Sequence, residues 1–225
     1  MAEIKTIIVN RSAYADNDLE AEALRAYLKE KGTFVVNLMS SPGAGKTTTL
    51  TKLINVLKDK FRIGVMEADI DSDVDAISIA KNTGVKSIQL HTSGMCHLDA
   101  GMTKSGLDGI NIEDLDLVFL ENVGNLVCPA EFDTGACLDI MILSIPEGDD
   151  KPLKYPLVFE KCDLVIINKI DTLEYFNFDF DKCNETIKRR NPNATIIPIS
   201  AKTGQNIDLV AEYLINKVSN WKENE

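Results

Sequence analysis

The chain is short of basic charge, of histidine and of long apolar runs, and each shortage excludes a class of protein. Only 24 lysines and arginines stand against 35 aspartates and glutamates, a net charge of −11. Proteins that bind nucleic acid or anionic membranes carry surplus basic residues instead. No run approaches the roughly 18 apolar residues of a membrane span, and the residues after Met1 do not resemble a secretory signal. We therefore expect a cytoplasmic protein with neither nucleic acid nor membrane as a partner.

Cysteine is also scarce, and its pattern does not suit disulfides. The five cysteines are odd in number and irregularly spaced, which in a chain without an export signal favours reduced thiols. Cys137, Cys162 and Cys183 read as small core residues. Of the two histidines, His91 reads as a polar residue with satisfied hydrogen bonds, whereas His97 directly follows Cys96.

Short apolar runs alternate with helical patterns along the 225 residues. The runs are nearly continuous, which is typical of strands covered on both faces. Strand–helix alternation predicts an α/β fold of three layers, a mostly parallel sheet with helices on both faces. We expect one domain over 1–225, in which residues 1–32 form an N-terminal strand and helix extension. The predicted strands are 33–39, 62–66, 86–90, 117–120, 140–143, 164–167 and 195–199, and the predicted helices are 16–31, 46–59, 73–82, 97–107, 154–161, 180–190 and 206–219.

A glycine-rich loop follows the strand at 33–39. It fits the phosphate-binding P-loop pattern, except that Ser40 replaces the usual first glycine. Its glycines let backbone amides turn toward phosphate oxygens, Lys46 would reach the β- and γ-phosphates, and the Thr47 hydroxyl would bind Mg²⁺. The alternative is a turn that merely joins a strand to a helix. The predicted phosphate-binding residues are Gly43, Ala44, Gly45, Lys46, Thr47 and Thr48.

Two later segments predict that the bound base is guanine. The Asp171 carboxylate can accept hydrogen bonds from both N1–H and the 2-amino group of guanine, a donor pair that adenine lacks. GTP and GDP are therefore expected rather than ATP, with Asn168 holding the loop and the base edge and the Lys169 stem covering the ring. A polar turn after a strand is the alternative for this segment alone. The predicted base-binding residues are Asn168, Lys169, Asp171, Ser200, Ala201 and Lys202.

The strand at 117–120 ends in Glu121 and Gly124, where GTPases usually have Asp-x-x-Gly. Glu121 can serve through a metal-bound water, and Gly124 can donate its N–H to the γ-phosphate. Further acids lie between residues 67 and 75. A solvated loop accounts for Asp71 and Asp73, whereas Asp69 and Asp75 are unranked candidates for Mg²⁺ or for orienting the attacking water. The predicted catalytic residues are Lys46, Thr47, Asp69, Asp75 and Glu121, and the last four are also the predicted Mg²⁺ ligands.

Three soft ligands form a candidate site for a second metal. Cys96 and His97 lie at the start of a predicted helix, and Cys128 lies four residues beyond Gly124. Two thiolates and an imidazole suit Zn²⁺ or Ni²⁺, and a helix N-terminus lowers a thiol pKa. The spacing by itself leaves an incidental arrangement open. The position of Cys128 beyond the switch glycine suggests that nucleotide state could move a metal ligand.

Four segments together resemble the HypB family of hydrogenase maturation factors, nickel-handling GTPases of the SIMIBI class of P-loop NTPases. They are residues 40–47, 94–100, 121–129 and 168–171, of which the third, ENVGNLVCP, is especially specific. The resemblance implies a SIMIBI-type G domain that hydrolyses GTP to GDP and phosphate. It further implies that hydrolysis is coupled to nickel insertion into [NiFe]-hydrogenase, with Cys96, His97 and Cys128 binding metal near a subunit interface.

The resemblance also implies partners. GTP would drive formation of a homodimer that buries the nucleotides, and Lys151 or Lys154 could contact the partner's phosphates, although a surface charge cluster explains both equally well. A HypA-type nickel/zinc protein would supply nickel, and the hydrogenase large-subunit precursor would receive it. Two features of some family members, an N-terminal Cys-x-x-Cys-Gly-Cys motif and a His-rich tract, are absent from these 225 residues.

Three other functions remain as alternatives. A urease-type nickel accessory GTPase would favour a Cys-Pro-His metal motif, whereas this chain has Cys96 beside His97 and Cys128 beside Pro129. A regulatory GTPase would use its cysteines only structurally. An ATP-using small-molecule kinase would not need Asp171.

Overall fold

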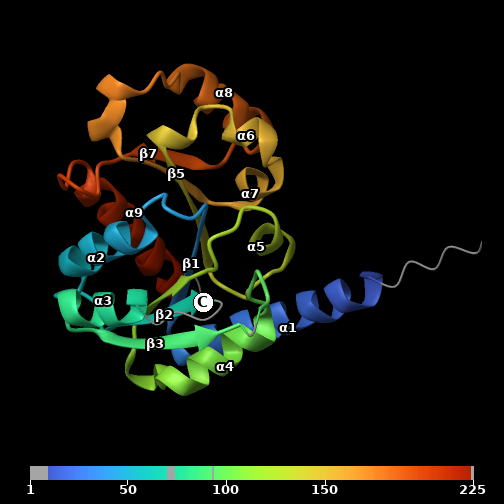
Figure 1. Ribbon diagram of the computed structural model, residues 1–225. Coiled ribbons are helices and arrows are strands. Elements are labelled where there is room, and N and C mark those ends of the chain that lie inside the picture. The colour runs from blue at the N-terminus through green and yellow to red at the C-terminus, as the bar shows by residue number, and fades with distance from the viewer. Residues whose placement is uncertain (1–9, 70–73, 93, 224–225) are drawn as a thin grey trace, which may run out of the picture.

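Seven parallel strands form one sheet in the order β3-β2-β4-β1-β5-β6-β7 (Figure 1). The computed structural model describes residues 10–69, 74–92 and 94–223, with only the backbone described at 10–14 and 74. The predicted α/β fold with a parallel sheet is confirmed. The strands are β1 (Phe34–Ser40), β2 (Ile63–Asp69), β3 (Lys86–His91), β4 (Leu117–Glu121), β5 (Leu138–Ser144), β6 (Leu164–Asn168) and β7 (Thr195–Pro198).

Helices cover both faces of the sheet and complete the three layers. Helices α2, α3 and α9 share one core with the sheet, to the left of the central strands in Figure 1, and α1, α4, α5, α7 and α8 pack on the other face. The helices are α1 (Asn10–Lys31), α2 (Lys46–Leu57), α3 (Val74–Thr83), α4 (Ala100–Ile110), α5 (Cys128–Glu131), α6 (Lys151–Lys154), α7 (Pro156–Lys161), α8 (Phe180–Arg190) and α9 (Ile207–Glu223), with 3₁₀ turns η1 (Ile112–Asp114), η2 (Ile145–Glu147) and η3 (Ile170–Tyr175).

The two-sided core explains why the strands read as continuous apolar runs. Val35 and Val36 are both fully buried, although neighbouring side chains of a strand point to opposite faces. Val36 packs with α2 and α9, whereas Val35 packs with Leu24 and Leu28 of α1. Each fully buried aliphatic side chain contributes about 1.5–3 kcal/mol. Helix α1 is therefore part of the core.

The register brings three functional strand ends to one edge of the sheet. Glu121 of β4 lies beside Leu38 of β1 on one side and beside Glu67 of β2 on the other. On the other side of β1 lies β5. Ser144 at the end of β5 pairs with Asn168 at the end of β6. Ligands of open parallel sheets bind beyond the carboxyl ends of the strands, so this edge is where a site is expected.

One predicted helix boundary is wrong in a way that matters for the site. Helix α4 begins at Ala100 instead of residue 97, because the Asp99 carboxylate accepts a hydrogen bond from the Met102 N–H at 2.7 Å and caps the helix there. Cys96 and His97 therefore lie in the loop that precedes the helix, and not in its first turn.

Other boundaries differ for local reasons. The predicted helix over 154–161 is two short helices, α6 and α7, because a proline at 156 disfavours helical backbone in the residue before it. The predicted strand within 1–32, like Asp71 and Asp73, lies outside the described residues, while the helix of that segment is α1. Among the described residues, none of the helices combines the length and apolar character that a bilayer span requires.

Candidate functional site

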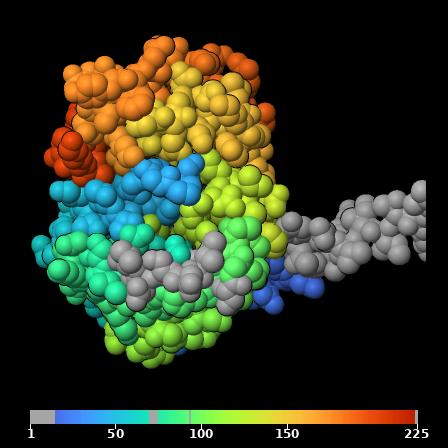
Figure 2. Space-filling view, viewed as in Figure 1, coloured from blue at the N-terminus to red at the C-terminus, as the bar shows by residue number. Residues whose placement is uncertain are grey.

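A cavity of about 630 Å³ lies at the carboxyl ends of β1, β2 and β4. In Figure 2 the loop after β1 and helix α2, in light blue, separate the orange C-terminal segments from the teal segment of α3. Most of the predicted phosphate- and magnesium-binding residues meet in this cavity. Its lining includes Gly43, Gly45, Lys46, Thr47, Thr48, Asp69, Asp75, Glu121, Gly124 and Lys169, together with Pro42, Glu67, Ala68, Asn122 and Val123.

The glycines of the phosphate loop determine its backbone conformation, and a hydrogen bond within the loop holds its lysine. Gly45 has a φ of +99°, and a Cβ there would lie 2.6 Å from the Asn168 amide nitrogen, so both the backbone and the space require glycine. The Lys46 ammonium donates to the Ser40 hydroxyl at 3.2 Å. Ser40, the departure from the usual motif, thus holds the lysine at the base of the loop. The N-terminus of α2 follows and adds its partial positive charge.

Three carboxylates and a hydroxyl form a candidate Mg²⁺ site in the same cavity. Ligand oxygens of Glu67, Asp75 and Glu121 lie within 4.8 Å of one another, and the Thr47 hydroxyl donates to Glu121 at 3.1 Å. Within the part of the chain that the structure describes, one buried oxygen of Glu67 and one of Glu121 have no hydrogen-bond partner. A hard divalent cation prefers oxygen ligands of this kind, so the donor set fits Mg²⁺.

Burial makes this acid cluster costly in the absence of a cation. Glu67 and Glu121 are 3% and 1% exposed. Desolvation, reinforced by the neighbouring Glu121, raises the pKa of Glu67 well above its usual range, and desolvation also raises the pKa of Glu121. Two such carboxylates do not both ionise readily beside each other. A bound cation would offset the repulsion and restore the charged forms.

Glu67 is a site residue that sequence reasoning missed. Asp69 and Asp75 were the candidates from the acidic segment, and the structure puts Asp75 in the carboxylate cluster and Asp69 in the cavity wall. Glu67 joins Glu121 in this cluster because β2 and β4 are neighbouring strands that place these two residues opposite each other. Because side chains alternate along a strand, Glu67 and Asp69 lie on the same face of β2. The pairing of β2 with β4, however, could not be predicted from the sequence.

A smaller pocket of about 190 Å³ adjoins the phosphate loop. It brings together the segments predicted to bind the base. The Asp171 carboxylate, whose side chain is 16% exposed, accepts a hydrogen bond from the Ser200 hydroxyl at 2.6 Å. The hydroxyl thereby fixes the orientation of the carboxylate. The pocket is lined by Gly45, Thr48, Asn168, Lys169, Asp171, Thr172, Ala201 and Lys202.

Asn168 joins the loops around this pocket. Its amide nitrogen donates to the Ala44 carbonyl at 2.9 Å, and its amide oxygen accepts from the Lys169 and Ala201 N–H groups at 2.7 and 3.1 Å. The Lys169 ammonium donates to the Gly43 carbonyl at 2.6 Å. The buried amide thus holds the phosphate loop and both segments predicted to bind the base in one arrangement.

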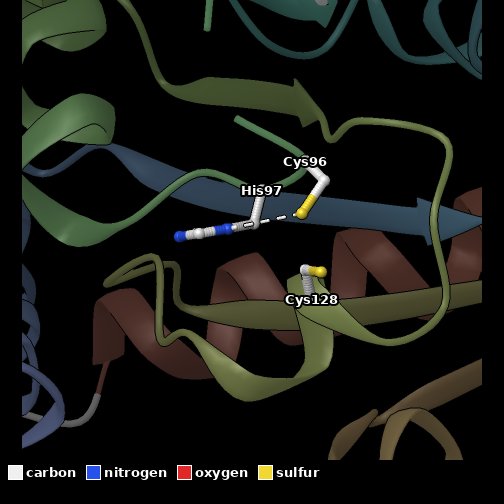
Figure 3. Close-up of side chains that lie close together, drawn as sticks. All are labelled: Cys96, His97 and Cys128. Carbon is white, nitrogen blue, oxygen red and sulfur yellow. Dashed lines mark hydrogen bonds between the residues drawn. The ribbon is translucent and has the colours of Figure 1, made fainter. Parts of the chain in front are cut away.

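The three predicted soft ligands converge in a second place. Figure 3 shows the side chains of Cys96, His97 and Cys128 close together. Their ligand atoms all lie within 4.8 Å of one another, and the Cys96 thiol is 3.9 Å from His97 Nδ1. The His97 ring stacks on Phe132 with a centroid distance of 3.8 Å and an interplanar angle of 12°. Burial lowers the pKa of His97 and favours the neutral ring that binds metals. The set fits a borderline-soft cation such as Zn²⁺ or Ni²⁺.

The thiol of Cys128 lies beside that of Cys96. The Cys128 thiol shares a hydrogen bond with Cys96, and this contact, with partial burial, raises the pKa of Cys128. Cys96 lies before α4 rather than in its first turn. A cation bound beside the Cys128 sulfur would favour its thiolate form.

The remaining predicted residues lie apart from both sites. Cys162 and Cys183 are buried and Cys137 half-buried, and burial raises the pKa of Cys137 to about 11, as expected of core thiols. His91 is exposed at the end of β3. Lys151 and Lys154 pair with acids of their own segment, Glu147 at 3.7 Å and Asp150 at 2.5 Å.

Comparison with known proteins agrees with this geometry. Residues 34–198 match the family "CobW/HypB/UreG, nucleotide-binding domain". The hydrogenase maturation factor HypB of Rhizobium leguminosarum bv. viciae is 39% identical over 214 residues, 95% of this chain and 71% of that protein. The crystal structure of Helicobacter pylori HypB in complex with nickel has a TM-score of 0.86 at 38% identity, covering 93% of this chain and 99% of that one.

A second solved structure, HypB from Archaeoglobus fulgidus, has a TM-score of 0.83 at 36% identity and covers 91% of this chain and 99% of that one. The resemblance inferred from the motifs is thus confirmed over more than nine-tenths of the sequence. The chain belongs to the HypB family of hydrogenase maturation GTPases.

Proposed function

We propose that this protein hydrolyses GTP to control the binding and release of nickel for insertion into [NiFe]-hydrogenase. The observation that carries the proposal is the short path between the two sites. Glu121 lies in the nucleotide cavity and Cys128 in the thiol–imidazole site, and only six residues separate them. A change at one end of this segment displaces a ligand at the other. The solved Helicobacter pylori relative is a complex with nickel, which supports nickel as the cargo.

Hydrolysis needs little from the protein beyond positioning and charge. Lys46 and the amides of the phosphate loop stabilise charge on the transferred phosphoryl group while water attacks in line. Thr47, Glu67, Asp75 and Glu121, with Asp69 as the alternative ligand, would hold Mg²⁺, and the ion would supply further neutralisation of this charge. Asp171 selects guanine by accepting hydrogen bonds from its N1–H and its 2-amino group. No basic or amide side chain in the described cavity is placed as an evident arginine finger or glutamine base, so intrinsic turnover should be slow.

The segment from Glu121 to Cys128, here called the switch segment, is positioned to sense the γ-phosphate. A Cβ on Gly124 would lie 3.1 Å from Pro42 of the phosphate loop, so this glycine packs directly against the loop that holds the phosphates. Loss of the γ-phosphate frees the segment and changes the distance between Cys128 and Cys96. By linkage, bound metal must then change the relative affinity for GTP and GDP by the same factor.

We propose that the active form is a GTP-dependent homodimer in the cytoplasm, with the chain as one G domain. Leu173, Tyr175 and Phe176 follow the base-binding segment and are 37%, 74% and 42% exposed, an apolar edge that a second copy would cover. Lys151 or Lys154, once released from its acid partner, contacts the phosphates bound to that copy. A HypA-type nickel/zinc protein supplies the metal and the hydrogenase large-subunit precursor receives it.

Nickel and zinc titrations of the purified protein test the proposal. Affinity should differ between the GDP-bound form and the form bound to a non-hydrolysable GTP analogue, and light scattering should find dimers only with the analogue. A variant with both Cys96→Ala and Cys128→Ala should lose the metal site but keep GDP binding. Equal nickel affinity in both nucleotide states contradicts the coupling. Unchanged metal binding in the double variant would instead favour a regulatory GTPase whose cysteines are structural.

A further inference from the structure

Helix α1 touches both chain segments that carry the thiol–imidazole ligands. The contact is made by Asn17, which is 8% exposed. Its amide oxygen accepts a hydrogen bond from the Ala100 N–H at 3.0 Å, and its amide nitrogen donates to the Asp133 carbonyl at 3.0 Å. These partners are 83 and 116 residues away in sequence. One side chain therefore joins the start of α4 to the loop that follows α5.

Both bonded groups lie close to proposed metal ligands. Ala100 comes three residues after His97, and Asp133 comes five residues after Cys128. Phe132, next to Asp133, stacks on the His97 ring. The two segments are thus held together at two adjacent points, by a ring stack and by the Asn17 amide. The relative position of these points sets how closely the ligand atoms approach.

A second residue of α1 fastens the same loop. Arg25 donates two hydrogen bonds to the Asp133 carboxylate at 2.5 and 2.6 Å, and a third to the Ala136 carbonyl at 3.0 Å. Paired charged groups of this kind make the strongest protein hydrogen bonds. Arg25 thus fixes the Cys128 side of the site to α1, while Asn17 is hydrogen-bonded to both sides.

We propose that Asn17 is a positioning residue for the thiol–imidazole metal site, which α1 clamps from outside the ligand set. The inference rests on the proposed metal-binding function of Cys96, His97 and Cys128. An asparagine suits the task because its short amide offers one acceptor and one donor. The acceptor satisfies a backbone N–H in the first turn of α4, which has no partner within the helix. Without the clamp, the two segments separate and metal affinity falls.

Metal titration of Asn17→Ala tests the clamp. Supporting groups outside the ligand set typically contribute 10–100-fold to metal affinity, so we expect nickel to bind at least tenfold more weakly. The thiolate-to-nickel charge-transfer absorption should weaken or shift, which reports on the geometry of the sulfur ligands rather than on folding. GTP hydrolysis without added nickel should stay within about twofold, since Asn17 lies outside the nucleotide cavity.

Two further variants keep the test decisive. Asn17→Asp retains the acceptor for the Ala100 N–H but loses the donor to Asp133, and it should give an intermediate affinity even if the alanine variant folds poorly. Leu28→Ala is the matched control, because Leu28 is fully buried on the same helix and forms no part of the clamp. It should lower the melting temperature while leaving nickel affinity and absorption unchanged below that temperature.

The outcomes separate the clamp from the site that it serves. If Cys96→Ser abolishes nickel binding while both Asn17 variants bind as the parent does, the clamp is refuted and the metal site stands. If Leu28→Ala weakens nickel binding as much as Asn17→Ala, general destabilisation explains the effect and the clamp is likewise refuted. If Cys96→Ser binds nickel normally, the proposed metal site itself fails.

Discussion

The first prediction concerns the base, because the proposed preference for guanine depends on one carboxylate, that of Asp171. Asp171 is largely buried and oriented by Ser200, so it can accept both guanine donors without rearranging. Hydrogen bonds to a charged group contribute about 1.5–3 kcal/mol each. Losing two costs about 3–6 kcal/mol, a factor of roughly 10² to 10⁴ in affinity. Asp171→Asn removes the charge and faces a guanine donor with an N–H, and we expect a loss in that range for GDP.

The assay is a competition titration of GDP, IDP and XDP against a fluorescent nucleotide. IDP lacks the 2-amino group, so the parent should prefer GDP by about tenfold or more, the value of one such bond. Asp171→Asn should abolish this preference and should favour XDP, whose 2-oxo group accepts from the new amide. Asp181→Asn, which removes an exposed carboxylate from α8, is the control and should change nothing.

The ratio of GDP to IDP affinity decides the matter. If Asp171→Asn weakens both nucleotides equally, or keeps the preference for GDP, then Asp171 does not contact the 2-amino group and the assignment is wrong. Ser200→Ala should weaken GDP by a smaller factor of about fivefold, the value of about 1 kcal/mol for one orienting hydrogen bond.

Three further results are expected. Gly45→Ala should lower GDP affinity and melting temperature more than Gly84→Ala, since both have positive φ but only the first would place a Cβ against Asn168; equal effects would remove the steric argument. Glu67→Gln should raise the melting temperature in EDTA by relieving repulsion between buried carboxylates. The same variant should slow Mg²⁺-dependent hydrolysis at least tenfold. A variant that is both less stable and fully active would contradict the assignment of Glu67 to the Mg²⁺ site. Burial raises the pKa of Asp139 from 3.8 to about 6, so the folded state holds this proton longer and the free energy of unfolding should fall by up to about 3 kcal/mol as pH rises from about 4 to 6. Asp139→Asn should flatten that part of a denaturation series, and an unchanged slope would show that another group titrates there.

Much of the fold was readable because the strands are apolar on both faces. The run at 164–167 became β6 with one added residue, and the helix over 180–190 has the predicted bounds. Helix boundaries were harder to predict where a polar side chain forms a hydrogen bond with a backbone N–H and so sets the start of the helix. Asp99 ends the loop before α4, although the apolar pattern continues upstream through Leu98. The spacing of apolar residues carries no information about the hydrogen bond that caps a helix, so it does not show where the helix begins.

The candidate site was predictable where it is contiguous in sequence. The loop at 40–48 and the segment at 168–171 carry their chemistry within a few residues. Glu67 was missed because its role depends on strand order, which places β2 beside β4. Asn17 was out of reach for a stronger reason, since its two partners are more than 80 residues away. Such side chains act through tertiary contacts, which no short motif records.

The order of the strands also governs when the site can first exist during synthesis. Strand β1, which leads into the phosphate loop, has β4 and β5 as its neighbours. The loop at 40–48 thus leaves the ribosome long before the strands that flank it. Translation from Ser40 to Ser144, the end of β5, takes roughly 5–20 s at the usual rates. Until Glu121 ends β4, the apolar β1 has no partner strand, and until Ser144 it has a partner on only one side. The strands that flank the phosphate loop are therefore complete only after residue 144, and nucleotide can stabilise the nascent chain only afterwards.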